Sequence, residues 1–188
     1  SRKYVQALSK HIGPTKDIPA PDVQTNAQII DWMVDEYSLI TGDTSRASFT
    51  GKSIKNGGSN GREEATGRGG YVVAKAVVSS AGIKDVTYAL QGIGNVGSYF
   101  ASAAATHESS WHCVAAADSK SALKQADISI ESLLAHKSAH RSIASYPYSE
   151  AITDSELISG SYTMLVLAAL GGVITANNAD TVRSQYII

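Results

Sequence analysis

The stretch Leu90-Gln91-Gly92-Ile93-Gly94-Asn95-Val96-Gly97 decides the fold of this chain. It places a G-x-G-x-x-G pattern after a strand-like apolar run that begins at Val86 and before a helix-like segment. Each glycine has its own role in such a turn. Gly92 permits the tight strand-to-helix turn, Gly94 lets the backbone approach a pyrophosphate, and Gly97 lets the helix lie close to the sheet. Because N–H groups at the helix start would face the phosphates, the stretch predicts a dinucleotide-binding turn.

An acidic residue downstream strengthens this interpretation. A second apolar run, from Cys113 to Ala117, ends at Asp118. A carboxylate about 20 residues beyond the glycines commonly accepts the hydroxyl groups of the adenosine ribose. The alternative is an ordinary strand-to-helix turn with glycines for packing alone. The strand, the helix and Asp118 together favour the dinucleotide.

Composition excludes several classes of partner. The 188 residues carry 16 Lys and Arg against 17 Asp and Glu, so the net charge of −1 predicts neither nucleic-acid nor anionic-membrane binding. The single cysteine, Cys113, falls inside a predicted strand, where an inert buried thiol is expected. No stretch approaches the roughly 20 apolar residues that cross a bilayer, and no signal core is visible. We expect a cytoplasmic protein, and no metal site is predicted.

Helical spacing dominates the first part of the chain. Tyr4, Leu8 and Ile12 recur at helical intervals before Gly13-Pro14. A longer helix follows, with Thr25 or Asp22 as its cap and Gly42 as its end. Its expected apolar face consists of Ile29, Ile30, Met33, Tyr37 and Ile40.

Strands and helices alternate in the rest of the chain. A helix is expected from about Arg62 to Ala81, a capping box at Thr153-x-x-Glu156, a buried strand over residues 163–167, and a short helix from Thr175. Residues 186–188 resemble the start of a further strand. This order predicts an α/β fold, a Rossmann-like doubly wound parallel sheet that is incomplete, preceded by helices from the end of a substrate domain. The expected domains are residues 1–50 and residues 51–188.

Several ordered segments resemble the glutamate dehydrogenase family. They are DIPAPDVQTNAQIIDWMVDEYS (17–38), TGKSIKNGGSNGREEATGRG (50–69), LQGIGNVGSYFA (90–101), AAADS (115–119) and LAALGGVIT (167–175). The W-M-x-D-E-Y segment favours the glutamate enzymes over the related leucine, valine and phenylalanine dehydrogenases. The resemblance implies NAD- or NADP-dependent, reversible deamination of L-glutamate to 2-oxoglutarate and ammonium. It also implies a homo-oligomer, which is a hexamer in this family.

The resemblance also implies roles for single residues. Asp22, in P-A-P-D-V, matches the aspartate that transfers protons between the amino group, water and the imine intermediate. From sequence alone Asp22 reads as a helix cap or turn residue. Arg62 and Thr66 match cofactor contacts, at the phosphates and the nicotinamide carboxamide respectively. The remaining implied cofactor contacts are Gly92, Gly94, Asn95, Val96, Gly97, Asp118, Ser119, Ala168 and Ala169.

Two departures from the family pattern carry expectations. The family supplies lysines in a G-G-x-K-G-G segment that this sequence does not contain, so we expect the 188 residues alone to be inactive. After Asp118-Ser119 the family has a glycine-rich turn, whereas Lys120 to Ala126 resembles a helix here. Asp118 favours NAD over NADP because it would repel a 2′-phosphate, although Ser119 and Lys120 could help to accommodate one. Two other readings stay open: a truncated, non-catalytic dinucleotide-binding or interaction module, and a dehydrogenase for another amino acid.

Overall fold

A computed structural model describes residues 1–22 and 25–188. The chain forms two compact units, Ser1–Glu63 and Glu64–Ile188. The domain boundary expected after residue 50 stays a prediction. In the described part of the chain, no helix combines the length and the apolar character that crossing a bilayer requires.

The first unit is built on two helices. Helix α1 spans Arg2–Leu8 and helix α2 spans Ala27–Thr41, and a short 3-10 helix, η1, spans Ile54–Asn56. The small core shared by these elements comprises Val5, Ile12, Ile30, Val34, Tyr37 and Phe49. On α2 the buried positions follow the i, i+4, i+7 spacing of one helix face. Ile40 lies off that stripe and is exposed, so its expected place in the buried face was wrong.

The ends of α2 are set by local chemistry. The cap is Asn26, whose side chain accepts a hydrogen bond from the N–H of Ile29 at 3.0 Å. The expected caps, Thr25 and Asp22, were wrong because the helix begins later, at Ala27. At the other end Gly42 adopts a left-handed conformation, with φ of 72°, and its N–H donates to the carbonyl of Ser38. That confirms the predicted stop.

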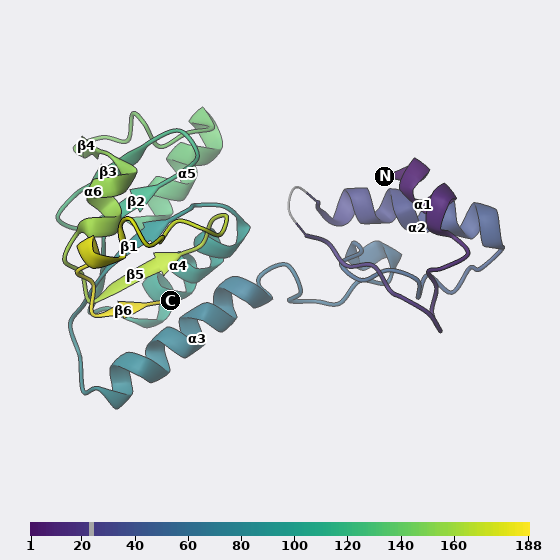
Figure 1. The fold of residues 1–188 in the computed structure, drawn as a ribbon, viewed down its shortest axis with the longest axis horizontal. Helices are drawn as coiled ribbons and strands as arrows, with labels where there is room; N and C mark the ends of the chain where they lie inside the picture. The colour runs from purple at the N-terminus through teal and green to yellow at the C-terminus, as the bar shows by residue number, and fades with distance from the viewer. Residues whose placement is uncertain (23–24) are drawn as a thin grey trace. The chain divides into compact units, whose positions relative to one another are not determined.

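The second unit contains a six-stranded mixed sheet with the order β4-β3-β2-β1-β5-β6 (Figure 1). Its strands are β1 (Val86–Gln91), β2 (Trp111–Ala117), β3 (Ala122–Lys124), β4 (Glu150–Ile152), β5 (Met164–Leu167) and β6 (Tyr186–Ile187). Strand β1 pairs in parallel with β2 and β5, and β5 pairs in parallel with β6. The predicted α/β fold is therefore confirmed. Strands β3 and β4 extend the sheet in antiparallel pairing.

Helices cover both faces of this sheet. They are α3 (Ala65–Ser80), α4 (Asn95–His107), α5 (Ile130–His140) and α6 (Asp154–Ser159). Because successive side chains of a strand point to opposite faces, Tyr88 and Leu90 join one core with α3, α4 and α5, whereas Ala89 joins another with α6. The cap of α6 is the predicted capping box of Thr153 and Glu156. Strand β1 thus lies in the middle of the sheet with apolar contacts on both sides.

Two local expectations differ from the structure. Residues 120–126, which resemble a helix in sequence, contain β3, because Leu123 is buried and pairs with Ala116 on β2. Near Thr175 the chain forms a turn, in which the side chain of Asn178 accepts the N–H of Thr175 at 2.7 Å. The short 3-10 helix η2 follows it over Ala179–Thr181.

Candidate functional site

The glycine turn lies at the carboxyl end of the central strand. Strand β1 ends at Gln91, and α4 begins at Asn95 with Gly94 as its N-cap. Gly92 donates its N–H to the carbonyl of Ala117, the last residue of β2, at 3.0 Å. In α/β sheets, ligands bind outside the carboxyl ends of the strands. The turn therefore has the position that its sequence predicts.

The three glycines meet different surroundings. Gly92 has φ of 99°, and a Cβ atom there would lie 2.7 Å from the carbonyl oxygen of Ala168. A Cβ atom at Gly97 would overlap the carbonyl oxygen of Gly92. At Gly94, by contrast, an added Cβ atom would meet no protein atom within 4 Å. Packing within the protein accounts for glycine at 92 and 97 but not at 94, which faces open space at the start of α4.

The end of β5 completes the neighbourhood of the turn. Ala168 donates its N–H to the carbonyl of Gln91 at 2.8 Å, so the segment after β5 lies beside the end of β1. A Cβ atom on Gly92 would also approach the side chain of Ala169. The structure thus brings Ala168 and Ala169 together with Gly92, as their assignment to one site requires.

Asp118 follows β2 at the same edge of the sheet, and its carboxylate organises the loop. Oδ1 accepts the N–H groups of Lys120 at 2.8 Å and Ser121 at 3.0 Å, and Oδ2 accepts the N–H of Ile143 at 3.0 Å. Burial pushes the pKa of Asp118 upward, but these backbone donors outweigh it and hold the pKa below its ordinary value. Ser119, on the same loop, is exposed. A hollow of about 240 Å³ opens beside the loop, against Ile152, Thr153 and Asp154.

Lys137 is a residue that sequence reasoning missed. From α5, its Nζ donates a hydrogen bond to the carbonyl oxygen of Ile93, inside the glycine turn. Burial lowers the pKa of Lys137, and the negative charge of Asp118 opposes that shift. The available signal was its place on the helix: Ile130 and Leu133 are buried, and Lys137 continues their stripe at i+7. A cation on an apolar stripe indicates a polar partner.

Thr66 lies near the glycine turn, because the next residue, Gly67, packs against the start of α4. A Cβ atom on Gly67 would overlap the carbonyl oxygen of Val96, so the first turn of α3 packs directly on the first turn of α4. Thr66 is exposed next to that contact. Arg62 is also exposed, and it belongs to the first unit.

Asp22 is likewise in the first unit and is exposed. Its backbone forms a tight turn with Thr25: the N–H of Asp22 donates to the Thr25 hydroxyl, which donates to the carbonyl of Asp22, each at 2.7 Å. Within residues 1–22 and 25–188, its carboxylate forms no hydrogen bond. Because Asn26 caps α2, the side chain of Asp22 has no capping role there. Val23 of the P-A-P-D-V motif lies outside the described residues.

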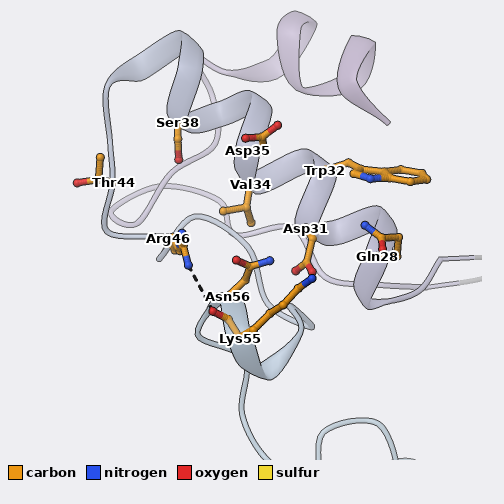
Figure 2. Close-up of a pocket in the computed structure, with 10 residues that line it drawn as sticks. All are labelled: Gln28, Asp31, Trp32, Val34, Asp35, Ser38, Thr44, Arg46, Lys55 and Asn56. Atoms are coloured by element: carbon orange, nitrogen blue, oxygen red, sulfur yellow. Dashed lines mark hydrogen bonds between the residues drawn. The ribbon is translucent and has the colours of Figure 1, made fainter.

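A cavity of about 390 Å³ lies within the first unit, between α2 and residues 44–56 (Figure 2). Charged side chains that line the cavity already form hydrogen bonds or ion pairs within this unit. The buried Asp31 accepts the N–H of Ser53 at 3.0 Å, and Asp35 pairs with Arg2 at 2.6 Å. Arg46 donates to the carbonyl of Lys55 at 3.4 Å. None of the predicted site residues lines this cavity, and its charges serve the local structure.

The sheet order and the glycine turn define a Rossmann-like α/β protein. The family described as Glutamate/Leucine/Phenylalanine/Valine dehydrogenase matches residues 57–188, and the dimerisation domain of the same family matches residues 1–39. The chain belongs to this family.

Curated relatives match this chain over its whole length. The glutamate dehydrogenase of Thermotoga maritima is 40% identical, the NAD-specific enzyme of Peptoniphilus asaccharolyticus is 38% identical, and the NADP-specific enzyme of a Synechocystis species is 36% identical. The chain spans about half the length of these relatives, 46% in each case. Among solved structures, the hetero-hexameric glutamate dehydrogenase of Thermus thermophilus in its leucine-bound form matches with a TM-score of 0.90 and 29% identity, over 100% of this chain and 44% of that one.

Proposed function

We propose that the chain is the dinucleotide-binding part of an NAD(P)-dependent glutamate dehydrogenase, which converts L-glutamate reversibly to 2-oxoglutarate and ammonium. The observation that supports this most is Gly94, a glycine that protein packing does not require, at the N-terminus of α4 beside the end of the central strand. The glutamate dehydrogenases among the relatives favour glutamate as the substrate.

The pyrophosphate would bind at the first turn of α4. Gly94 provides no side-chain cap for the helix, so backbone N–H groups there can donate to an anion, and the helix dipole favours negative charge. Asn95, Val96 and Gly97 form this turn. On either side, Asp118 with Ser119 and Ala168 with Ala169 would contact the adenosine half, while Thr66 and Arg62 would contact the nicotinamide and phosphate groups.

We propose NAD as the preferred cofactor. Asp118 is held ionised by three backbone donors, and a fixed carboxylate disfavours the 2′-phosphate of NADP. The positive charge of Lys137 interacts with Asp118 and would offset part of the repulsion between Asp118 and a 2′-phosphate. The relatives include both NAD-specific and NADP-specific enzymes, so the ratio of the two affinities is the quantity to measure.

Asp22 would transfer protons at the amino group and the imine. Its carboxylate is exposed and carries no capping duty, so it is available to a substrate. Positioned general acid–base catalysis contributes about 10²–10⁴-fold to a rate. Asp22 is therefore expected to affect turnover and to leave cofactor affinity nearly unchanged.

The test is a spectrophotometric assay on the full-length protein with 2-oxoglutarate, ammonium and NADH or NADPH. Asp22→Asn should lower kcat by about 10²–10⁴-fold with unchanged NADH affinity. Asp17→Asn, on the same segment and also exposed, is the matched control. Retained turnover in Asp22→Asn would remove that residue from the mechanism. Faster turnover with the 2-oxo acids of leucine, valine or phenylalanine would instead identify a sister dehydrogenase.

Size and assembly test the remaining alternative. An intact mass near 19.7 kDa with dinucleotide binding and no turnover would identify a short binding module. We propose that the protein is cytoplasmic and assembles into a homo-hexamer. The hetero-hexameric glutamate dehydrogenase from Thermus thermophilus supports an assembly of six subunits, and light scattering would measure the size of that assembly.

A further inference from the structure

Two histidines lie on one face of α5, outside the proposed dinucleotide contacts. His136 and His140 are four residues apart, so their side chains are neighbours along the helix. Their ring centroids are 4.3 Å apart, with the planes inclined at 36°. A rotation of the exposed His140 ring about χ2 can direct one of its nitrogens at an ion that is also bound to His136. From this pair we propose a divalent transition-metal site of the Cu²⁺, Ni²⁺ and Zn²⁺ class.

The surroundings hold His136 in place. The buried Tyr146 packs edge-on against its ring at 5.7 Å, and the hydroxyl of Ser145 lies 3.3 Å from Nε2. Partners of this kind orient a metal-binding imidazole and fix its tautomer. His140 is exposed, which leaves it free to turn toward an ion. One ligand is thus fixed and the other adapts.

The position on the helix also suits a cation. His140 is the last residue of α5, where the carbonyl ends of the helix carry partial negative charge. Two cations neighbour the pair in sequence: Lys137 donates its ammonium to the carbonyl of Ile93, and the backbone of Arg141 forms the left-handed C-cap.

The donor set selects the class of metal. Imidazole suits Zn²⁺, Cu²⁺ and Ni²⁺, whereas Mg²⁺ and Ca²⁺ prefer oxygen ligands. Among the described residues there is no group of three or more His, Cys, Asp and Glu side chains that could hold a metal. The site therefore supplies two protein nitrogens, with water in the other positions, and its affinities should follow the order Cu²⁺ above Ni²⁺, with Co²⁺ and Mn²⁺ weaker.

Metal binding would stabilise the last turn of α5 against local unfolding. That turn contains Lys137, between the two histidines, and leads to Ile143, whose N–H donates to Asp118. An ion that binds both rings binds only the closed turn. At a metal concentration of ten times Kd, local opening of this turn should be about tenfold rarer.

The experiment is hydrogen exchange of residues 130–140 in the full-length protein without a histidine tag, with and without Ni²⁺, Cu²⁺ or Mg²⁺. We expect about tenfold slower exchange with Ni²⁺ and Cu²⁺ at ten times Kd, and no change with Mg²⁺. Electron paramagnetic resonance of the bound Cu²⁺ should report two imidazole nitrogens.

Variants test whether the slower exchange requires this pair of histidines or follows from metal binding to any exposed histidine. His140→Ala should abolish the slowing, whereas His11→Ala, at an exposed histidine of the first unit, should keep it. Combining His140→Ala with Ser138→His keeps the number of histidines but places them two apart, on different faces, and should also abolish it. Equal slowing in wild type and His140→Ala, or a Cu²⁺ spectrum with one nitrogen ligand, would overturn the proposal.

Discussion

At the scale of single residues, the three glycines of the turn separate folding from ligand binding. Gly92 and Gly97 are required by neighbouring protein atoms, whereas Gly94 faces open space. A substitution at Gly94 should therefore lower the affinity for the dinucleotide, whereas a substitution at Gly97 should lower the stability of the fold.

Gly94→Val is expected to abolish dinucleotide binding, because its side chain would occupy the place of the pyrophosphate, while its Cβ atom would meet no protein atom within 4 Å. Gly97→Ala should instead lower the free energy of unfolding by about 1–3 kcal/mol, since its Cβ would overlap the carbonyl of Gly92. Calorimetric titration with NADH and thermal unfolding of both variants measure the two effects. Unchanged NADH affinity in Gly94→Val would refute the phosphate assignment.

Asp118 gives a pH-dependent prediction. Its pKa is depressed in the folded protein, because backbone N–H donors outweigh the opposing effect of burial. The stability that it contributes is therefore fully present above the unfolded pKa of about 3.9, and is lost as the pH falls toward the folded value. Asp118→Ala should be less stable near neutral pH, and its unfolding free energy should fall less steeply over this acidic range. Parallel pH profiles of wild type and variant in urea would contradict this.

At the scale of elements, local chemistry determined what the sequence could predict. The stop at Gly42, the capping box of α6 and the glycine turn each depend on residues a few positions apart, and each was found where expected. Contacts between distant residues were not predictable. The bond from Lys137 to Ile93 joins positions 44 apart, and the bond from Ile143 to Asp118 joins positions 25 apart. For the same reason β3 was mistaken for a helix, since its pairing with β2 and β4 distinguishes it.

The capping box of α6 is directly testable. The N–H of Glu156 donates to the Thr153 hydroxyl at 3.1 Å, and the N–H of Thr153 donates to the Glu156 carboxylate at 2.7 Å. Thr153→Ala should cost about 0.5–2 kcal/mol in the free energy of unfolding. Thr153→Ser keeps the hydroxyl and should cost less. Urea unfolding compares the three proteins, and equal losses in both variants would show that the methyl group matters more than the cap.

At the scale of the whole molecule, the chain combines two compact units, and the proposed dinucleotide contacts fall mostly in the second. A ligand stabilises the structure that binds it by RT ln(1 + [L]/Kd), which is about 2.7 kcal/mol at one hundred times Kd. The second unit should therefore be stabilised more than the first.

We expect NADH at saturation to slow hydrogen exchange in β1, in the first turn of α4 and in the loop at Asp118. Exchange in α1 and the C-terminal half of α2 should change little. Hydrogen exchange followed by mass spectrometry on the full-length protein measures both regions at once, with Gly94→Val as the control that should lose the effect. Equal slowing in both units would show that the dinucleotide acts on the chain as a whole.

The central place of β1 also has a consequence for the order of folding. Val86 at the start of β1 pairs with Trp111 at the start of β2, 25 positions away, whereas Tyr88 of β1 pairs with Met164 of β5, 76 positions away. Closing the longer loop costs on the order of 1 kcal/mol more chain entropy. The β1–α4–β2 segment should therefore form first, and β5 should join after the main kinetic barrier. Val86→Ala is then expected to slow refolding, whereas Val166→Ala should mainly accelerate unfolding. Stopped-flow measurements that found the reverse would place the nucleus at β5.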